Sequence, residues 1–475
     1  MDSVEALAAA LLSPSLRVTT GEHGLSVNAT QDIKAGERLV HVPASYTITA
    51  DRVLQTPTLS ALLSRETEAH ISIAAWLMLQ TDQTRHEKDG RTDSHSMLRT
   101  YIHTLSRADI DCTLLWTDDE INALQRSRSA QKARQLQAWS AEAWSSLSRH
   151  PESPWRIDLP GTNASYHLAR FRWSLCAVWS RSFQLRCLDE TCGGAAGASS
   201  GGVWRVLVPG ADLFNHDANV ATAGLDVRAE GGMPERWHHV AEDDDSDVTT
   251  PASDLFDGDA DADAFNIRAT RAIPAGSEIT LDYGPRSNAD LLTTHGFALL
   301  DNAAESLPLS LSAAPNDEAA AVKAMILKEG NLSAPYMLSP SALTSDSDLL
   351  VALRIQYALP SELTGSRWKD AFAGRPLSAR NERKWRGALR GIVEGMLRDY
   401  EGETTAAEDR DLLATLSSTG RMSLADKRFR AAIVTRLGEK DLLRRVLGAL
   451  DQLRVQAAAV GVVGGEVQKE PTAVD

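Results

Sequence analysis

The sequence predicts an α+β protein in which two short β-rich segments flank a long helical insert and precede an all-helical C-terminal domain. The β-rich segments share a pattern: Ile-x-Ala-Gly, followed within two residues by glutamate, occurs at 33–37 and again at 273–278. Extended-type residues lie on both sides of each copy. Between the copies, apolar residues recur at helical spacing over 70–79 and 117–147. After residue 302 the chain becomes Ala/Leu-rich, and 349–359 is its clearest helical segment.

The composition excludes several classes of protein. Of the 475 residues, 43% are hydrophobic, which is enough to build cores and excludes wholesale disorder. The net charge of −15 disfavours a general binder of nucleic acid. No stretch reaches the roughly 18 apolar residues of a membrane span, and the chain start lacks the basic residues of a signal peptide. We therefore expect a soluble protein of the cytoplasm or nucleus; a plastid location stays open, although no clear transit peptide is present.

Four cysteines are present: Cys112, Cys176, Cys187 and Cys192. No two of them form a Cys-x-x-Cys pair, so the spacing indicates neither a disulfide framework nor a zinc site. We expect free thiols in a reducing compartment and no bound metal.

Changes in composition divide the chain into five parts. They are an N-terminal β-rich part over 1–55, a helical insert over 56–168, a C-terminal β-rich part over 169–302, a helical domain over 303–460 and a flexible tail over 461–475. An acidic insertion near 229–263 interrupts the third part. Its segment 242–263 carries ten acidic residues and no lysine or arginine, so we expect it to be disordered.

Turn residues and periodicity place the individual elements. The turn Lys34-Ala-Gly-Glu37 separates two short strands, at 25–27 and 38–42. A helical pattern runs from 171 to 183, and a strand follows over 204–209. Four tryptophans of the insert are predicted core anchors: Trp116, Trp139, Trp144 and Trp155.

Short motifs in a fixed order carry a resemblance to a known family. They are Gly21-Glu-His-Gly-Leu25, Asp32-Ile-Lys-Ala-Gly-Glu37, Ser180-Arg-Ser-Phe183, Asp212-Leu-Phe-Asn-His216, Asp282-Tyr-Gly284, Arg286-Ser-Asn-Ala289 and Gly296-Phe297. One such motif occurs by chance, but all of them in this order resemble a SET-domain methyltransferase. The long insert and the helical C-terminal part are similar to those of the Rubisco large-subunit lysine methyltransferase and the actin histidine methyltransferase.

The resemblance implies a fold, a cofactor and a partner. In this family a C-terminal segment threads under a loop to form a pseudoknot, an exception to the usual avoidance of knots, and this brings Asn215-His216 beside Tyr283. The cofactor would be S-adenosylmethionine, and a monomeric enzyme would dock a protein substrate on its helical C-terminal domain. The segment 367–390 contains eight basic residues and only two acidic ones. We interpret the basic residues first as a solvated helix face and second as a docking surface for an acidic partner.

The matching positions carry expected roles. Tyr283 is the predicted catalytic residue, because a lysine nitrogen with a pKa of about 10.4 must lose its proton and then be oriented for attack. The expected cofactor contacts are Gly21, His23, Gly24, Arg181, Asp212, Asn215, His216 and Phe297. The expected residues of the substrate channel are Phe183, Arg286 and His295. Such catalysis works by positioning and electrostatics and requires no metal.

Two positions bear on the target residue. His295 stands where the plant lysine enzymes have a second tyrosine, which puts the target in question. Phe183 stands where lysine-modifying relatives carry an aromatic residue and the histidine-modifying one a polar amide. Because an apolar wall suits a neutral amine better than an imidazole, lysine is the expected target. A histidine target, and an inactive SET-like module that only binds proteins, are the alternatives.

Overall fold

The computed structural model describes residues 3–21, 24–86, 95–156, 158, 163–187, 203–217, 221–228, 237–239, 264–312, 317–344, 347–417 and 422–464. Two compact units make up the chain. The first contains 1–117, 133–286 and 290–296, and the second contains 118–132, 287–289 and 297–475. The acidic segment 242–263 lies outside the described residues, so its disorder stays a prediction.

Short strands form the framework of the first unit. β1 (Leu16–Gly21) and β2 (Gly24–Ala29) form an antiparallel hairpin. A three-stranded sheet has the order β3 (Arg38–Pro43), β10 (Ala264–Ala269), β8 (Ala223–Arg228). A four-stranded sheet has the order β4 (Ile48–Thr49), β6 (Val203–Leu207), β5 (Ser182–Cys187), β9 (Trp237–His239). The strands predicted on either side of the turn at 34–37 are present as β2 and β3, but each pairs with another strand.

The two copies of the repeated pattern lie against each other. Ile33 and Ile273 exchange backbone hydrogen bonds, both at 2.9 Å. Each copy turns at a glycine in the left-handed region, with φ +81° at Gly36 and +82° at Gly276, where other residues are disfavoured by about 1–2 kcal/mol. The repeat thus ties the two β-rich segments together.

A parallel strand pair positions the predicted site. β7 (Asn215–His216) runs parallel to β11 (Thr280–Leu281), so that Thr280 lies beside Asn215 and Leu281 beside His216. Tyr283 follows β11 by two residues, and its backbone N–H donates to His216 Nδ1 at 3.0 Å. The predicted juxtaposition of Asn215-His216 with Tyr283 is confirmed.

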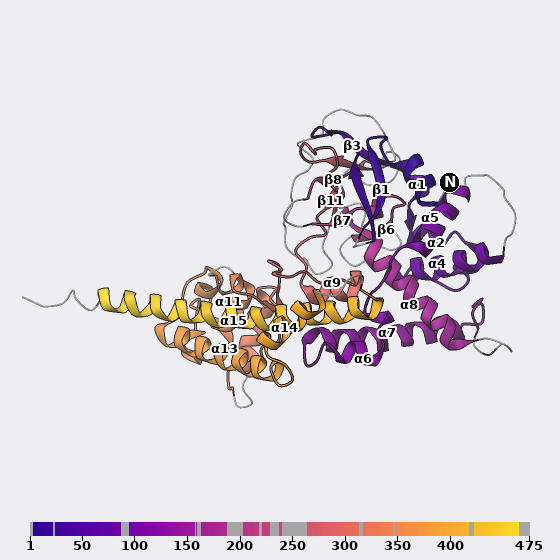
Figure 1. Cartoon of the computed structure of the whole chain (residues 1–475). Helices are drawn as coiled ribbons and strands as arrows, with labels where there is room; N and C mark the ends of the chain where they lie inside the picture. The colour runs from indigo at the N-terminus through magenta and orange to yellow at the C-terminus, as the bar shows by residue number, and fades with distance from the viewer. Residues whose placement is uncertain are drawn as a thin grey trace, which may run out of the picture. The chain divides into compact units, whose positions relative to one another are not determined.

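Helices pack beside these strands in the first unit, and Figure 1 shows α4, α5 and α8 next to the sheets. The helices of this unit are α1 (Ser3–Leu11), α2 (Ala50–Val53), α3 (Pro57–Ser60), α4 (Ala69–His86), α5 (His95–Arg107), α8 (Ala164–Arg181) and most of α7 (Arg128–Arg149). Three of the four predicted anchor tryptophans are buried and Trp139 packs against the core, which confirms their role. The helix predicted to reach 183 ends at Arg181, and Phe183 lies in β5.

The prediction of free thiols was wrong for two of the four cysteines. Cys112 and Cys176 form a disulfide with Cα atoms 5.9 Å apart, and both are fully buried. Cys112 precedes the 3₁₀ turn at Thr113–Leu115 and Cys176 lies within α8. The pairing depends on tertiary packing, which is why the Cys spacing gave no signal. Cys192 and the side chain of Cys187 lie outside the described residues.

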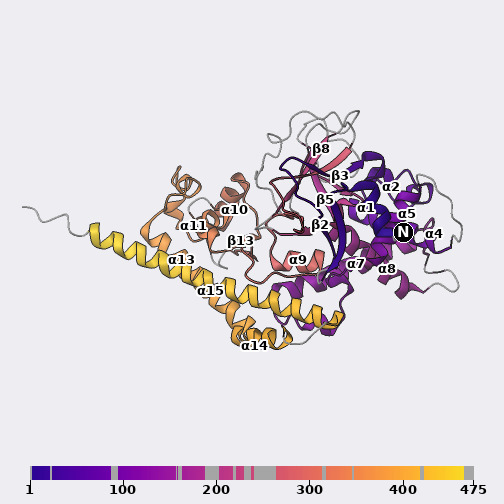
Figure 2. The ribbon, with the colours of Figure 1, turned by 45° about the horizontal axis from the view of Figure 1, so that its top comes forward.

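The second unit is built around the long helix α15 (Leu424–Gly464). α13 (Ala379–Tyr400) and α14 (Ala406–Ser417) pack along α15 (Figures 1 and 2). Four shorter helices complete the helical part: α6 (Asp118–Asn122), α10 (Ala320–Glu329), α11 (Asp348–Gln356) and α12 (Lys369–Phe372). α9 (Asn288–His295) begins in this unit and ends in the first. Within the described ranges, no helix is long and apolar enough to cross a membrane.

Two features of the second unit correct the predictions. β12 (Leu307–Leu309) and β13 (Tyr336–Leu338) form an antiparallel pair, so the domain is not all-helical. In each strand two buried residues flank an exposed one, which is the period-two pattern of a strand and too short to be noticed among helices. α15 continues to Gly464, so 461–464 are helical and not part of a loose tail.

Most of the bases between 367 and 390 lie on the surface. Arg375, Arg386 and Arg390 pair with nearby carboxylates. Arg380, Arg383 and Lys384 are exposed on the first turns of α13. This exposure agrees with the preferred interpretation of a solvated helix face.

Residues 118–132 belong to the second unit, although the sequence placed them in the insert over 56–168. The buried carboxylate of Glu439 on α15 accepts backbone N–H groups of Arg128 and Ser129 at 3.1 and 3.3 Å, and the Ser129 hydroxyl at 2.5 Å. These N–H groups belong to the first residues of α7, which have no carbonyl acceptor within the helix. A carboxylate at this end also interacts favourably with the helix dipole. Arg428 and Glu120 add an ion pair at 2.8 Å. The other predicted boundaries stay predictions.

Gly296 and Gly276 allow a matched test of backbone packing. Both have positive φ, +78° and +82°, but a Cβ at 296 would lie 2.3 Å from the Asp111 carbonyl oxygen, whereas a Cβ at 276 would meet nothing within 4 Å. We expect Gly276→Ala to lower the free energy of unfolding by about 1–2 kcal/mol. Gly296→Ala should lower the free energy of unfolding by about 1–3 kcal/mol more than Gly276→Ala does, because the backbone at Asp111 must move to admit the Cβ. Urea unfolding measures both, and equal losses would contradict the Asp111 contact.

Candidate functional site

Tyr283 lies at the centre of the predicted site. Its hydroxyl donates to the Phe214 carbonyl oxygen at 2.7 Å. Its ring lies against two imidazoles, with ring centroids 4.9 Å away at His216 and 5.1 Å away at His295. Burial raises the pKa of Tyr283 to about 12. The phenol is therefore protonated at neutral pH, and its oxygen retains lone pairs that can accept a hydrogen bond.

His216 is held as a neutral ring. Its Nδ1 lies 3.0 Å from the Tyr283 N–H and 3.4 Å from the Leu281 carbonyl oxygen. The shorter contact makes Nδ1 an acceptor and assigns the ring proton to Nε2. Burial lowers the pKa of His216, and Asp282, 4.0 Å away, only partly opposes this. A neutral imidazole stacked on Tyr283 keeps positive charge away from the phenol.

Asn215 connects three separate segments. Its Nδ2 donates to the Leu25 carbonyl oxygen at 3.1 Å and to Glu278 Oε1 at 2.7 Å. Because both amide hydrogens are used in this assignment, Oδ1 is the atom with which Asn215 could bind a donor on a ligand. Glu278 was not predicted as a site residue. Its signal was available, since it is the glutamate of the second repeat.

The β1–β2 hairpin ends beside Leu25 with two glycines. Gly21 pairs with Gly24, whose φ is +91°. A Cβ added to Gly21 would meet no atom of the described residues within 4 Å. Among these residues, the backbone at Gly21 is therefore open to the approach of a ligand. His23 lies outside the described residues, and its predicted contact stays a prediction.

Arg181, which is partly buried, pairs with the buried side chain of Asp212. Arg181, the last residue of α8, donates from Nη1 to the Asp212 carbonyl oxygen at 2.9 Å and lies 3.4 Å from Asp212 Oδ2. Arg181 Nε is buried and has no hydrogen-bond partner among the described residues. The Asp212 carboxylate also accepts the Tyr101 hydroxyl at 3.1 Å. Tyr101 carried no sequence signal beyond its place in a helical insert.

The three predicted channel residues have different surroundings. His295 lies against the Tyr283 ring, and its Nδ1 is 2.6 Å from Thr294 Oγ1. Arg286 is largely buried and donates from Nε to the Tyr283 carbonyl oxygen at 3.0 Å. Phe183 is buried in the core, with its ring centroid 5.1 Å from that of Phe265. Phe297 belongs to the second unit, so its predicted role in the cofactor site stays a prediction.

The arrangement has two chemical capacities. A buried guanidinium with an unpartnered N–H suits a carboxylate or another anionic group. A protonated phenol between a neutral imidazole and His295 can accept one N–H of a nitrogen nucleophile and hold its lone pair in one direction.

Comparisons with known proteins identify two families in the chain. The SET-domain family matches residues 24–284, more than half of the chain. The Rubisco LSMT substrate-binding family matches residues 314–443.

Individual relatives are distant. The actin-histidine N-methyltransferase of Canis lupus familiaris is 24% identical over 449 residues, covering 90% of this chain and 64% of the relative. The chain thus spans less than two thirds of the length of this relative. A solved structure of the SET domain of LSMT bound to lysine and AdoHcy has a TM-score of 0.65 and 20% identity, covering 96% of this chain and 92% of that one. Rubisco LSMT bound to AdoMet has a TM-score of 0.62 and 19% identity, with 96% and 93% covered. At these identities the structural likeness shows the fold.

Proposed function

Because the chain belongs to the SET-domain family, we propose that it is an S-adenosylmethionine-dependent protein methyltransferase. The observation that carries the proposal is the convergence of Asn215, His216 and Tyr283 on the parallel β7–β11 pair. Nearby, a buried guanidinium N–H of Arg181 has no partner in the described part of the chain. A module that only bound proteins would gain nothing from bringing this half-buried polar set together around a buried donor without a described partner.

The residues present fit the cofactor. Arg181 Nε would donate to its carboxylate, because a buried N–H without an acceptor is unfavourable by about 1–3 kcal/mol. Asn215 Oδ1 would accept from its ammonium group, since Nδ2 is engaged by Leu25 and Glu278. The open space at Gly21 would admit the ligand beside the hairpin.

The chain's own residues supply positioning. When bound, S-adenosylmethionine would supply the methyl group for the new carbon–nitrogen bond, and its sulfur would keep the electron pair of the broken carbon–sulfur bond. The nitrogen loses a proton to solvent before it attacks. Tyr283 Oη accepts a remaining N–H and aims the lone pair. With a pKa of about 12, Tyr283 stays protonated and does not itself remove the proton.

A lysine side chain is the proposed target. Phe183 supports this choice, because its buried apolar ring against Phe265 suits a neutral amine and its methyl groups. The solved SET domain of LSMT is bound to lysine, which supports the same choice by analogy. The protein substrate would dock on the second unit, where the substrate-binding family matches.

Histidine is the second candidate target. The curated relative at 24% identity is an actin-histidine N-methyltransferase. His295, against the Tyr283 ring, is the residue that favours it. The imidazole of His295 could form a hydrogen bond with the ring nitrogen of a target histidine that does not receive the methyl group.

Calorimetric titration tests the cofactor site. We expect S-adenosylmethionine to saturate the wild-type chain and Asn215→Ala to weaken binding by about 1–3 kcal/mol. Asn28→Ala is the matched control, because Asn28 lies in the neighbouring hairpin and its amide donates to Thr19 and Ser26. The absence of saturable heat from the wild-type chain would overturn the proposal.

Mass spectrometry then identifies the target. The chain is incubated with methyl-labelled cofactor and a cell lysate, and with peptides made as lysine and histidine versions of one sequence. Label on lysine supports the main proposal, and label on histidine alone supports the second candidate. Saturable cofactor binding without label transfer to any protein would contradict the enzyme and favour a binding module.

A further inference from the structure

Tyr101 is a fully buried residue of the helical insert that reaches the proposed cofactor site. It lies on α5, far from the sequence motifs, and none of its side chain is exposed. Its hydroxyl donates to Asp212 Oδ2 at 3.1 Å across 111 residues of sequence. Burial raises the pKa of Tyr101 well above its ordinary value, so the hydroxyl remains a donor at neutral pH.

The Asp212 carboxylate has protein partners at both oxygens. Oδ1 accepts the Gly210 N–H at 3.1 Å, and Oδ2 receives the Tyr101 hydroxyl and lies 3.4 Å from Arg181 Nη1. The side chain of Asp212 is 1% exposed. Burial raises the pKa of Asp212, while Arg181 and Tyr101 oppose this by stabilising the carboxylate. The carboxylate is therefore an internal anchor and not a ligand-facing group.

Arg181 depends on this anchor for its orientation. Its Nη1 donates to the Asp212 carbonyl oxygen at 2.9 Å and faces the carboxylate. Its Nε is the buried donor for which the described residues offer no partner. A guanidinium is planar, so fixing Nη1 also fixes the direction in which Nε points.

We infer that Tyr101 is a positioning residue: through Asp212 it holds Arg181 with its Nε aimed at the carboxylate of the bound cofactor. This inference rests on the proposed function. It extends the cofactor site to the helical insert. The hydrogen bond from Tyr101 to Asp212 would contribute to recognition of the cofactor's carboxylate.

The test compares two ligands, of which one has the amino-acid portion with its carboxylate and the other does not. S-adenosylhomocysteine carries the carboxylate, and 5′-methylthioadenosine lacks the whole amino-acid portion. We expect Tyr101→Phe to weaken S-adenosylhomocysteine by about 5- to 10-fold in calorimetry, the value of one hydrogen bond in a charged network. Binding of 5′-methylthioadenosine should be unchanged, because the ring and its packing are kept. Tyr166→Phe, at an exposed tyrosine, should change neither.

A double-mutant comparison separates positioning from packing. In an Arg181→Lys background, removing the Tyr101 hydroxyl should have no further effect on S-adenosylhomocysteine. Equal weakening of both ligands, or an undiminished effect in the Arg181→Lys background, would show that Tyr101 only supports the pocket and overturn the inference. An unchanged affinity for S-adenosylhomocysteine would overturn it as well. If the wild-type chain binds neither ligand, the proposed function itself fails, which is a distinct outcome.

Discussion

Tyr283→Phe is expected to lower turnover by about 100-fold or more, because it removes only the oxygen that orients the attacking nitrogen. The phenylalanine ring would keep the stacking between His216 and His295. Cofactor affinity should therefore stay within about twofold, since no cofactor contact is assigned to the hydroxyl. Single-turnover kinetics with labelled cofactor measure the first effect and calorimetry the second.

The pH profile adds an independent check on this role. A phenol with a pKa of about 12 does not titrate near neutral pH. Activity should rise with pH as the substrate amine loses its proton, and Tyr283→Phe should lower this curve without changing its shape. Tyr166→Phe is the control for loss of a tyrosine hydroxyl at an exposed position. Turnover close to that of the wild-type chain would remove Tyr283 from the mechanism.

The centre of the site could be predicted because short motifs in a fixed order carry a resemblance to a known family. Asn215-His216 and Asp282-Tyr283 are short motifs, and the repeated Ile-x-Ala-Gly turns mark the two segments that meet. Parallel pairing of β7 with β11 then brings His216 and Tyr283 together. The family resemblance predicted this juxtaposition, and no local signal in the sequence specifies the pairing of the two strands.

The missed features depend on side chains that meet across the fold. Tyr101 lies in the insert over 56–168 that the sequence predicts to be helical, but nothing in the sequence indicates that Asp212 is its partner. The Cys112–Cys176 disulfide has the same origin. In α15, Arg436 and Lys440 are four residues apart, so they lie on one face of the helix. Because both are charged, the sequence pattern indicates an exposed face. Both side chains are instead almost completely buried against α14.

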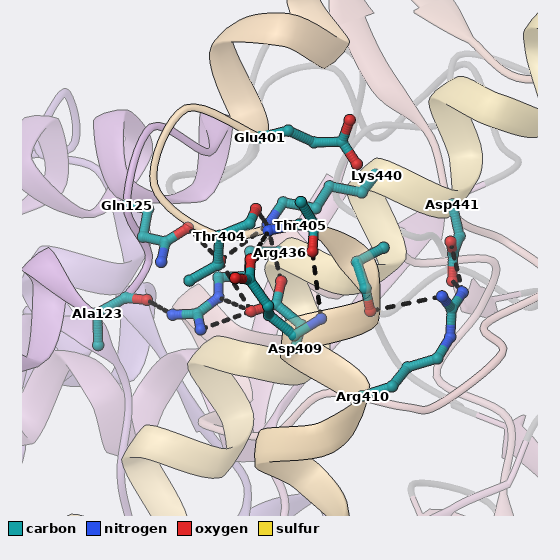
Figure 3. Close-up of polar contacts among 12 residues, drawn as sticks. Ala123, Gln125, Glu401, Thr404, Thr405, Asp409, Arg410, Arg436, Lys440 and Asp441 are labelled. Carbon is teal, nitrogen blue, oxygen red and sulfur yellow. Dashed lines mark hydrogen bonds and ion pairs between the residues drawn. The ribbon is translucent and has the colours of Figure 1, made fainter.

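These two cations converge on one carboxylate, as Figure 3 shows. Asp409 is fully buried and accepts Arg436 at 2.7 and 2.9 Å and Lys440 Nζ at 2.7 Å. Lys440 also donates to the Thr404 carbonyl oxygen at 2.6 Å. Burial pushes the pKa of Asp409 upward, but the hydrogen bonds from Arg436 and Lys440 outweigh it and hold the pKa below its ordinary value.

Breaking this cluster should have the largest effect on stability. We expect Asp409→Ala to destabilise the second unit by about 3–5 kcal/mol, because it leaves two buried cations without a counter-charge. The neighbouring Arg410–Asp441 pair is the control: it is bonded at 2.7 and 2.8 Å, but Arg410 is 55% exposed. Water screens that pair, so Asp441→Asn should cost about 1 kcal/mol or less. Differential scanning calorimetry of the second unit's transition measures both variants.

Two further measurements decide whether the unpaired buried cations cause the loss of stability in Asp409→Ala. The depressed pKa of Asp409 contributes stability that is present above its unfolded pKa of about 3.9 and is lost as pH falls through the folded value. Asp409→Asn should therefore lose less stability than the wild-type chain on acidification below about pH 4. A triple variant, Asp409→Leu with Arg436→Met and Lys440→Met, removes all three charges and should be more stable than Asp409→Ala, because no ion is left unpaired. If the triple variant is the less stable of the two, the cluster acts through its shape and not through its charges.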